Sequence, residues 1–176
     1  MLIFVACSSL LLHYLCRMIE LRIHRFNVDF MEFVEAEEKG KFGNQMYLVL
    51  IGIAPLLCLL EFFSTSNASF SAVELIYGLI VLAASLVLRL WSIDTLGRMW
   101  SLRIIFVPGA DMVAKGPYRY FRHPEYLSRF LDYLAFVLIW QAWIGFWLIS
   151  SLYVAISIYC AVIEHRQMAE LRDLTA

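Results

Sequence analysis

The fold is decided by residues 126–163, YLSRFLDYLAFVLIWQAWIGFWLISSLYVAISIYCAVI. This run contains two apolar stretches, residues 126–140 and 143–163, with only Gln141 and Ala142 between them. A membrane-spanning helix needs roughly 20 mostly apolar residues, so the second stretch is long enough and the first is short. Because the link is so brief, the sequence predicts a tight hairpin of two antiparallel spans.

The rest of the chain has the same character. Of its 176 residues 62% are hydrophobic, and the mean hydropathy is +0.74. A soluble domain is about 45–50% apolar, and here the excess lies in blocks, with further spans predicted at 2–19, 46–63 and 72–91. Residues 1–16 lack the basic start and cleavage site of a signal peptide, so we expect a retained first span. The prediction is an all-α integral membrane protein with about five transmembrane helices in one domain, 1–176.

The basic residues indicate an orientation. All 14 Lys and Arg can lie on one side of the membrane if the chain crosses it five times. They fall in the connections 17–45 and 92–125, in the C-terminal tail, or near span ends, whereas 64–71 and 141–142 contain none. The positive-inside rule then predicts the N-terminus outside and the C-terminus in the cytoplasm. The net charge of −1 gives no basis for a nucleic-acid partner.

A polar run precedes the fourth span, namely Gly116-Pro117-Tyr118-Arg119-Tyr120-Phe121-Arg122-His123-Pro124-Glu125-Tyr126. Pro124 disfavours a helical conformation at His123 and is suited to begin the next helix. The N-terminal end of such a helix binds anions, including carboxylates. An aromatic, basic belt at the membrane surface would explain Tyr118 and Arg119 equally well, but it gives no role to His123 or to the prolines.

Two charged residues lie inside the fourth span. Arg129 and Asp132 are three apart and therefore share one helical face. They form either an ion pair between helices or the polar wall of a cavity that admits a substrate head group. Glu164 follows the last apolar run, where it is either an interfacial cap or a carboxylate that returns to the region of His123.

Other polar residues are interpreted as structural. His13 is alone in the first span, and the carboxylates near span ends are interpreted as solvated or interfacial: Glu61, Glu74 and Asp94. The cysteines share no metal-type spacing and are interpreted as small buried hydrophobic residues: Cys7, Cys16, Cys58 and Cys160.

The polar run, the tight hairpin and Glu164 together resemble the isoprenylcysteine carboxyl methyltransferase family over roughly residues 85–172. The run Leu96-Gly97-Arg98-x-Trp100-Ser101 looks like a small prokaryotic branch that includes alkylpyrone O-methyltransferases. The resemblance implies an integral membrane enzyme that uses S-adenosylmethionine. It also implies a lipophilic acceptor from the bilayer, which is a prenylcysteine carboxylate, an alkylpyrone hydroxyl or a related lipid.

The resemblance further implies that residues 92–172 bind the cofactor. The family's contacts fall on Arg103, Ala110, Asp111, Met112, Val113, Tyr118, His123, Pro124, Glu125, Tyr126 and Glu164. The faces of Tyr118 and Tyr126 would stabilise the sulfonium by cation–π contact, by about 0.5–2 kcal/mol each. Arg129, Asp132 and Glu164 are the predicted catalytic residues, and the displacement requires no metal.

The chain departs from the family pattern at three positions. Ser128 stands in place of a glycine, and His165 in place of a second glutamate. Cys160 stands where the family has an arginine assigned to the substrate carboxylate, and a thiol cannot form that bidentate contact. Arg89 or Arg129 supplies the missing charge, or the acceptor is a different lipid.

Two other functions remain open. Some sterol reductases resemble the family in their C-terminal region and bind a nicotinamide cofactor. However, a phosphate-rich cofactor would require more basic side chains or a Gly-rich loop, and neither is obvious in this sequence. The departures at 128, 160 and 165 instead favour a non-enzymatic membrane scaffold with the same fold.

Overall fold

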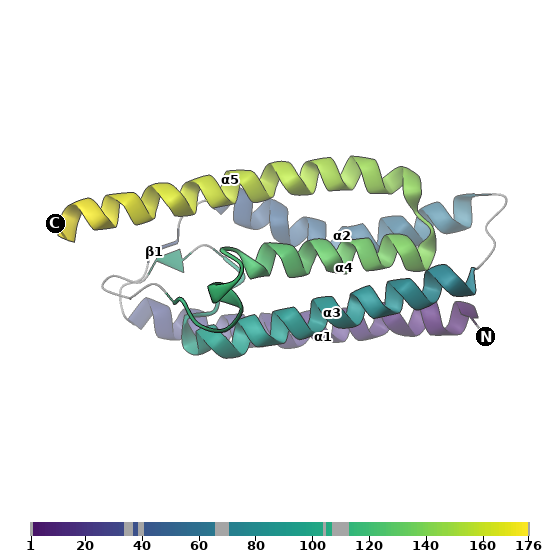
Figure 1. Cartoon of the computed structure of the whole chain (residues 1–176), viewed down its shortest axis with the longest axis horizontal. Coiled ribbons are helices and arrows are strands. Elements are labelled where there is room, and N and C mark those ends of the chain that lie inside the picture. The colour runs from purple at the N-terminus through teal and green to yellow at the C-terminus, as the bar shows by residue number, and fades with distance from the viewer. Residues whose placement is uncertain are drawn as a thin grey trace.

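The computed structural model describes residues 2–33, 37–38, 41–65, 71–103, 105–106 and 113–175, which form a bundle of five α-helices (Figure 1). The α-helices are α1 (Leu2–Phe33), α2 (Lys41–Ser64), α3 (Ala72–Leu96), α4 (Pro124–Trp140) and α5 (Trp143–Thr175). Two 3₁₀ turns, η1 (Gly97–Met99) and η2 (Gly116–Arg119), lie between α3 and α4. The strands β1 (Glu37–Glu38) and β2 (Ile105–Phe106) pair antiparallel and join the connection after α1 to the loop after α3. The predicted all-α membrane fold is confirmed.

The helices differ in how readily they can cross a bilayer. Three segments of the described chain are long and apolar enough, namely Leu2–Met31, Ala72–Met99 and Trp143–Ile163. The apolar part of α2 is shorter, Leu48–Ser64, and α4 has 17 residues. The two termini lie at opposite ends of the bundle (Figure 1), as an odd number of crossings requires. Five crossings therefore stay a prediction that agrees with this arrangement.

The first helix is longer than predicted. The first span was expected to end at residue 19, yet α1 continues to Phe33. The reason is a stripe of buried residues spaced alternately three and four apart, which keeps one face of the helix against the bundle. Its members are His13, Arg17, Glu20, His24, Asn27 and Met31.

The predicted ends of the later helices agree with the structure. Pro124 occupies the first turn of α4, with His123 at the N-cap. Gln141 has φ 54°, in the left-handed region, and ends α4. Because α5 begins at Trp143, the two helices form the tight hairpin that the sequence predicts.

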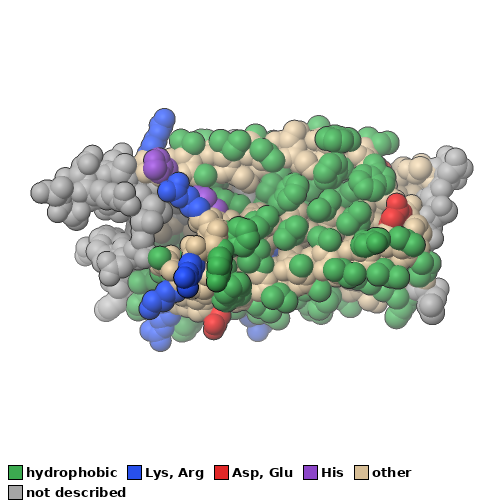
Figure 2. Space-filling view, in the orientation of Figure 1, with side chains coloured by type: hydrophobic (Ala, Val, Ile, Leu, Met, Phe, Trp, Pro, Cys, Tyr) green, Lys and Arg blue, Asp and Glu red, His purple; other side chains and the backbone are tan. Residues whose placement is uncertain are grey.

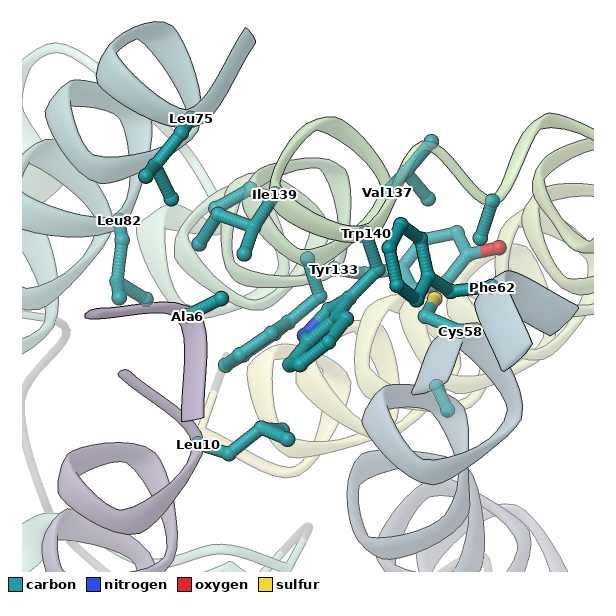
Figure 3. Packing of buried hydrophobic residues seen from close by; sticks show 14 of the residues in the cluster. Ala6, Leu10, Cys58, Phe62, Leu75, Leu82, Tyr133, Val137, Ile139 and Trp140 are labelled. Carbon is teal, nitrogen blue, oxygen red and sulfur yellow. The ribbon is translucent and has the colours of Figure 1, made fainter. Parts of the chain in front are cut away.

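Helix α4 lies at the centre of the bundle. Its residues Phe136, Ile139 and Trp140 are fully or almost fully buried, and the Trp140 ring packs edge-on against Phe62 of α2 with centroids 5.5 Å apart (Figure 3). In contrast, the outer surface is covered with hydrophobic side chains such as Phe4 and Trp147, both 75% exposed (Figure 2). This is the pattern of a helix bundle whose solvent is lipid.

Candidate functional site

The polar run lies at the end of the bundle where Lys and Arg side chains gather (Figure 2). Its first residues form η2, which begins at Gly116 with φ 54°. A side chain at position 116 would also collide with Thr95 of α3, so both the backbone conformation and the close packing require glycine. The segment is thereby held against α3 before it enters α4.

His123 and Tyr126 form the aromatic part of the site. Their rings are stacked, with centroids 5.4 Å apart and an interplanar angle of 28°. Both residues are half-buried at the start of α4. The hydroxyl group of Tyr153 on α5 donates a hydrogen bond to the carbonyl oxygen of Tyr126 at 2.9 Å. The N-terminus of α4 is thereby tied to α5.

The predicted site on α5 lies close to this aromatic pair. Tyr126 packs against a cluster that contains Cys160. Glu164 is four residues later in the same helix, so its backbone lies one turn further along the same face. The structure describes the backbone of Glu164 and not its side chain.

The thiol of Cys160 is enclosed. Only 2% of the residue is exposed, and a Cβ atom added to Gly43 of α2 would lie 2.8 Å from its Sγ atom. An arginine at this position would therefore need α2 and α5 to move apart. The family's carboxylate contact has no equivalent at position 160.

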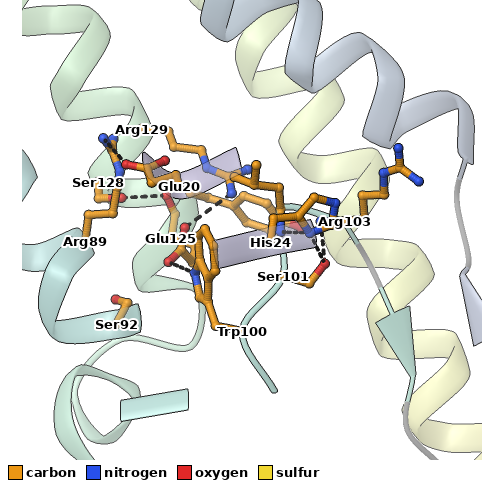
Figure 4. A network of polar contacts seen from close by, with 12 residues as sticks. Glu20, His24, Arg89, Ser92, Trp100, Ser101, Arg103, Glu125, Ser128 and Arg129 are labelled. Carbon is orange, nitrogen blue, oxygen red and sulfur yellow. Dashed lines mark hydrogen bonds and ion pairs between the residues drawn. The ribbon is translucent and has the colours of Figure 1, made fainter. Parts of the chain in front are cut away.

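Glu125 makes contacts within the protein. Its Oε1 atom accepts a hydrogen bond of 2.7 Å from the indole Nε1–H of Trp100, and its Oε2 atom lies 3.3 Å from Nη2 of Arg129 (Figure 4). Trp100 is completely buried. The Glu125 carboxylate therefore fixes the loop after α3 to the start of α4.

The remaining predicted cofactor residues are only partly described. Tyr118 is half-buried and Pro124 is buried, whereas Arg103 and Val113 are exposed. Arg103 lies in the loop beside His24 and Ser101 (Figure 4). Ala110, Asp111 and Met112 lie outside the described residues, so their contribution stays a prediction.

Asp132 is the centre of a buried ionic cluster. Its Oδ2 atom lies 3.2 Å from each of three nitrogens: Nδ1 of His13, Nη2 of Arg17 and Nη2 of Arg89. Glu20 joins the same two arginines, at 2.7 Å from Arg17 and 3.4 Å from Arg89 (Figure 4). The cluster connects α1, α3 and α4, so the ion pair between helices that the sequence left open is present.

The alternative, the polar wall of a cavity that admits a substrate head group, stays a prediction. Arg129 and Asp132 both line a crevice with a volume of about 20 Å³, which is room for about one or two water molecules. Its walls are otherwise mostly apolar and come from α1, α2, α4 and α5: His13, Leu50, Ile51, Ala54, Pro55, Tyr133, Phe136, Ile149 and Tyr153. Pro55 also removes one backbone hydrogen bond from α2 at this point.

The sequence analysis missed the contribution of α1. His24 Nδ1 accepts a hydrogen bond from the backbone N–H of Leu102, and Asn27 donates to the carbonyl oxygens of Gly97 and Trp100. The signal that predicts these roles is the three-and-four spacing of polar residues after His13. A stripe of that kind on an otherwise apolar helix marks a buried polar face.

Glu61 was interpreted as a solvated or interfacial charge, and the structure adds a specific contact to this interpretation. Its two carboxylate oxygens accept hydrogen bonds from the backbone N–H groups of Ile144 and Gly145, at 2.8 and 2.7 Å. The carboxylate thus caps the first turn of α5, where a negative charge is favoured.

Comparisons with known proteins match a large part of this chain. The model of the isoprenylcysteine carboxyl methyltransferase family matches residues 75–174. The chain is also 30% identical over 134 residues to the uncharacterized protein YpbQ of Bacillus subtilis (strain 168), an alignment that covers 76% of this chain and 79% of that protein. No solved structure matches. The family match begins in α3 and ends in α5, so it contains the polar run, α4 and Glu164.

Proposed function

This chain belongs to the isoprenylcysteine carboxyl methyltransferase family of membrane methyltransferases, and we propose that it transfers a methyl group from S-adenosylmethionine to an oxygen atom of a lipophilic acceptor. The observation that carries the proposal is the contact between the N-terminal end of α4 and the C-terminal half of α5. There the stacked rings of His123 and Tyr126 lie at a helix N-terminus, and Tyr126 packs one turn before Glu164.

The groups at this junction fit the proposed cofactor. S-adenosylmethionine has a sulfonium, a carboxylate, an amino group and ribose hydroxyls. An aromatic face stabilises a cation, and the N–H groups and dipole at the start of a helix stabilise a carboxylate. The contact between the start of α4 and the C-terminal half of α5 offers both, together with a carboxylate at Glu164 that suits the amino group or hydroxyls.

Each residue then has a role in positioning. The bound cofactor supplies an electrophilic methyl group on sulfur. Tyr118 and Tyr126 would face the sulfonium, and His123 would hold the carboxylate. Glu164 would accept hydrogen bonds from the amino group or hydroxyls, and Arg103 with residues 110–113 would close the site. The protein must hold the acceptor oxygen about 3–3.5 Å from the methyl carbon, in line with the breaking bond.

The crevice is the candidate route for an acceptor from the bilayer. Its walls are mostly apolar and Arg129 and Asp132 supply a polar end, but a hydrocarbon chain would need the helices around it to open beyond the volume of about 20 Å³. Because Cys160 is enclosed between Gly43 and Tyr126, the acceptor is not clamped there through a carboxylate. A prenylcysteine carboxylate, an alkylpyrone hydroxyl and a related lipid all remain candidate acceptors.

The proposal is tested by cofactor binding and by product analysis. Purified protein in detergent is titrated with S-adenosylmethionine, and then incubated with methyl-labelled cofactor and a total bacterial lipid extract. We expect His123→Ala and Glu164→Gln to abolish binding. Two changes of the same residue types serve as controls: His165→Ala on the exposed part of α5, and Glu74→Gln in α3.

Both controls are expected to retain binding. Unchanged affinity for S-adenosylmethionine in His123→Ala and Glu164→Gln would mean that the contact between the start of α4 and the C-terminal half of α5 is not the cofactor site. Binding without any labelled lipid would support the scaffold, and binding of a nicotinamide cofactor instead would support the reductase.

A further inference from the structure

The two ring nitrogens of His13 have different surroundings. His13 is 3% exposed, and its ring packs edge-on against Phe136. Its Nδ1 atom lies 3.2 Å from Oδ2 of Asp132. Its Nε2 atom has no hydrogen-bond partner within the part of the chain that the structure describes. Buried polar groups are rarely left unpaired, so this nitrogen is a candidate to bind a ligand.

The histidine also lines the crevice, and its chemistry there follows from Asp132. A proton on Nδ1 faces the carboxylate, and the lone pair is then on Nε2. Arg17 and Arg89 each place a nitrogen 3.2 Å from the same carboxylate oxygen and so help to fix its position beside the histidine. A neutral imidazole oriented by a carboxylate is suited to take up a proton on its other nitrogen.

We propose that His13 is the catalytic base that removes the proton from an acceptor hydroxyl group, and that Asp132 is the positioning residue that orients it. The inference rests on the methyltransferase function proposed above. In this step the acceptor oxygen forms a bond to the methyl carbon, and the carbon–sulfur bond breaks with its electron pair left on sulfur. The hydroxyl proton moves to Nε2 of His13, and the donor leaves as a neutral thioether.

The charged groups at the crevice are paired within the protein. Of the residues that line it, Asp132 lies 3.2 Å from His13, Arg17 and Arg89, and Arg129 lies 3.3 Å from Glu125 of the same helix. The described cations there already face a carboxylate. The other titratable side chains that line the crevice are Tyr133 of α4 and Tyr153 of α5.

The crevice adjoins the proposed cofactor site. Tyr153 lines it and donates a hydrogen bond to the carbonyl oxygen of Tyr126. Arg129, three residues after Tyr126 on α4, lines it as well. An acceptor oxygen near His13 would therefore lie on the bilayer side of the aromatic pair.

The test compares acceptors of different acidity. Purified full-length protein is incubated with methyl-labelled S-adenosylmethionine and either a long-chain alkylphenol or the same alkylphenol with a nitro group beside the hydroxyl. The first acceptor is almost entirely protonated at neutral pH, whereas a substantial fraction of the second is ionised. A total bacterial lipid extract serves as a third acceptor. The variant His13→Gln keeps a polar side chain but cannot take up the proton.

We expect His13→Gln to lower kcat/KM for the alkylphenol about 100-fold or more and to change that for the nitrophenol much less. Binding of S-adenosylmethionine should be unchanged. Ser9→Ala is the control, because Ser9 is buried one turn earlier in α1 and its hydroxyl bonds only to the carbonyl oxygen of Ala6 among the described contacts.

Three results would overturn the inference. The first two are a kcat/KM that His13→Gln lowers for no acceptor and one that it lowers equally for both phenols. The third is methylation of carboxylates alone by the unaltered protein, because ionised carboxylates have no proton to remove. An unaltered protein that neither binds the cofactor nor methylates any acceptor contradicts the proposed function instead.

Discussion

Trp100 shows how a single side chain can join three parts of the bundle. It is completely buried, and its indole N–H donates a hydrogen bond of 2.7 Å to the carboxylate of Glu125. Its carbonyl oxygen accepts a hydrogen bond of 2.8 Å from Asn27 of α1. The loop after α3 is therefore held between α1 and the start of α4.

Replacing Trp100 with Phe should destabilise the protein. The change leaves the partly buried Glu125 carboxylate without this donor, which costs about 1–3 kcal/mol, in addition to any loss of packing. Thermal unfolding in detergent measures the effect. Trp91→Phe is the control, because Trp91 is 44% exposed. Equal unfolding temperatures for the two variants would mean that the hydrogen bond to Glu125 does not hold the loop.

Asp132→Asn should lower the free energy of unfolding more than Trp100→Phe does. Removing the charge leaves Arg17 and Arg89 buried beside a neutral side chain, and breaking a buried ion pair costs about 3–5 kcal/mol. Asp94→Asn makes the same change at an exposed position of α3 and should be close to neutral. Chemical unfolding of both variants in the same detergent compares them, and a small effect at Asp132 would mean that the cluster is well hydrated.

Helices α3 and α4 approach each other closely because of Gly78. A Cβ atom added there would lie 2.6 Å from the side chain of Ile139 and 3.0 Å from the carbonyl oxygen of Ala135. Small residues at helix contacts allow this approach in membranes. In contrast, a Cβ atom added to Gly52 of α2 would meet nothing within 4 Å.

These two glycines form a matched pair. Gly78→Ala should destabilise the bundle by about 1–3 kcal/mol, because the added methyl group forces α3 and α4 apart. Gly52→Ala should be neutral or slightly stabilising, because alanine favours a helix. Unfolding temperatures of the two variants provide the measurement. Similar losses in both would contradict the close packing at Gly78.

The contact between Glu61 and the start of α5 can be tested in the same way. Glu61→Gln replaces a charged acceptor of two backbone N–H groups with a neutral one, at a cost of about 0.5–2 kcal/mol. Glu74→Gln changes the same residue type near the start of α3, outside this contact. A loss at Glu61 that is no larger than the loss at Glu74, measured by thermal unfolding, would show that the capping contact contributes little.

Some elements could be predicted from the sequence because local signals define them. The proline at 124 and the two-residue link after Trp140 fixed the start of α4 and the hairpin. The end of α1 was not predicted from apolarity, because residues 17–33 carry a polar stripe whose partners lie on α3, α4 and the loop after α3. The aromatic part of the candidate site followed from a local motif, whereas the pairing of His13 with Asp132 joins residues far apart in the chain.

The distribution of charge over the whole bundle supports a defined orientation. Lys and Arg side chains gather at the end where α5 finishes (Figure 2), and the N-terminus lies at the other end (Figure 1). The positive-inside rule predicts that the basic end faces the cytoplasm. A reporter enzyme that is active only in the cytoplasm should therefore be active when fused to the C-terminus and inactive when fused to the N-terminus. The opposite result would invert the predicted orientation.

The short length of α4 has a consequence for how a lipid reaches the proposed cofactor site. Seventeen residues span about 25 Å, whereas the hydrocarbon layer is about 30 Å thick. With Trp140 at the outer edge of that layer, the first turn of α4 would lie about 5 Å below the level of the inner head groups. A greasy molecule could then react while its tail remained among the acyl chains, and the water-soluble reactant would descend to meet it.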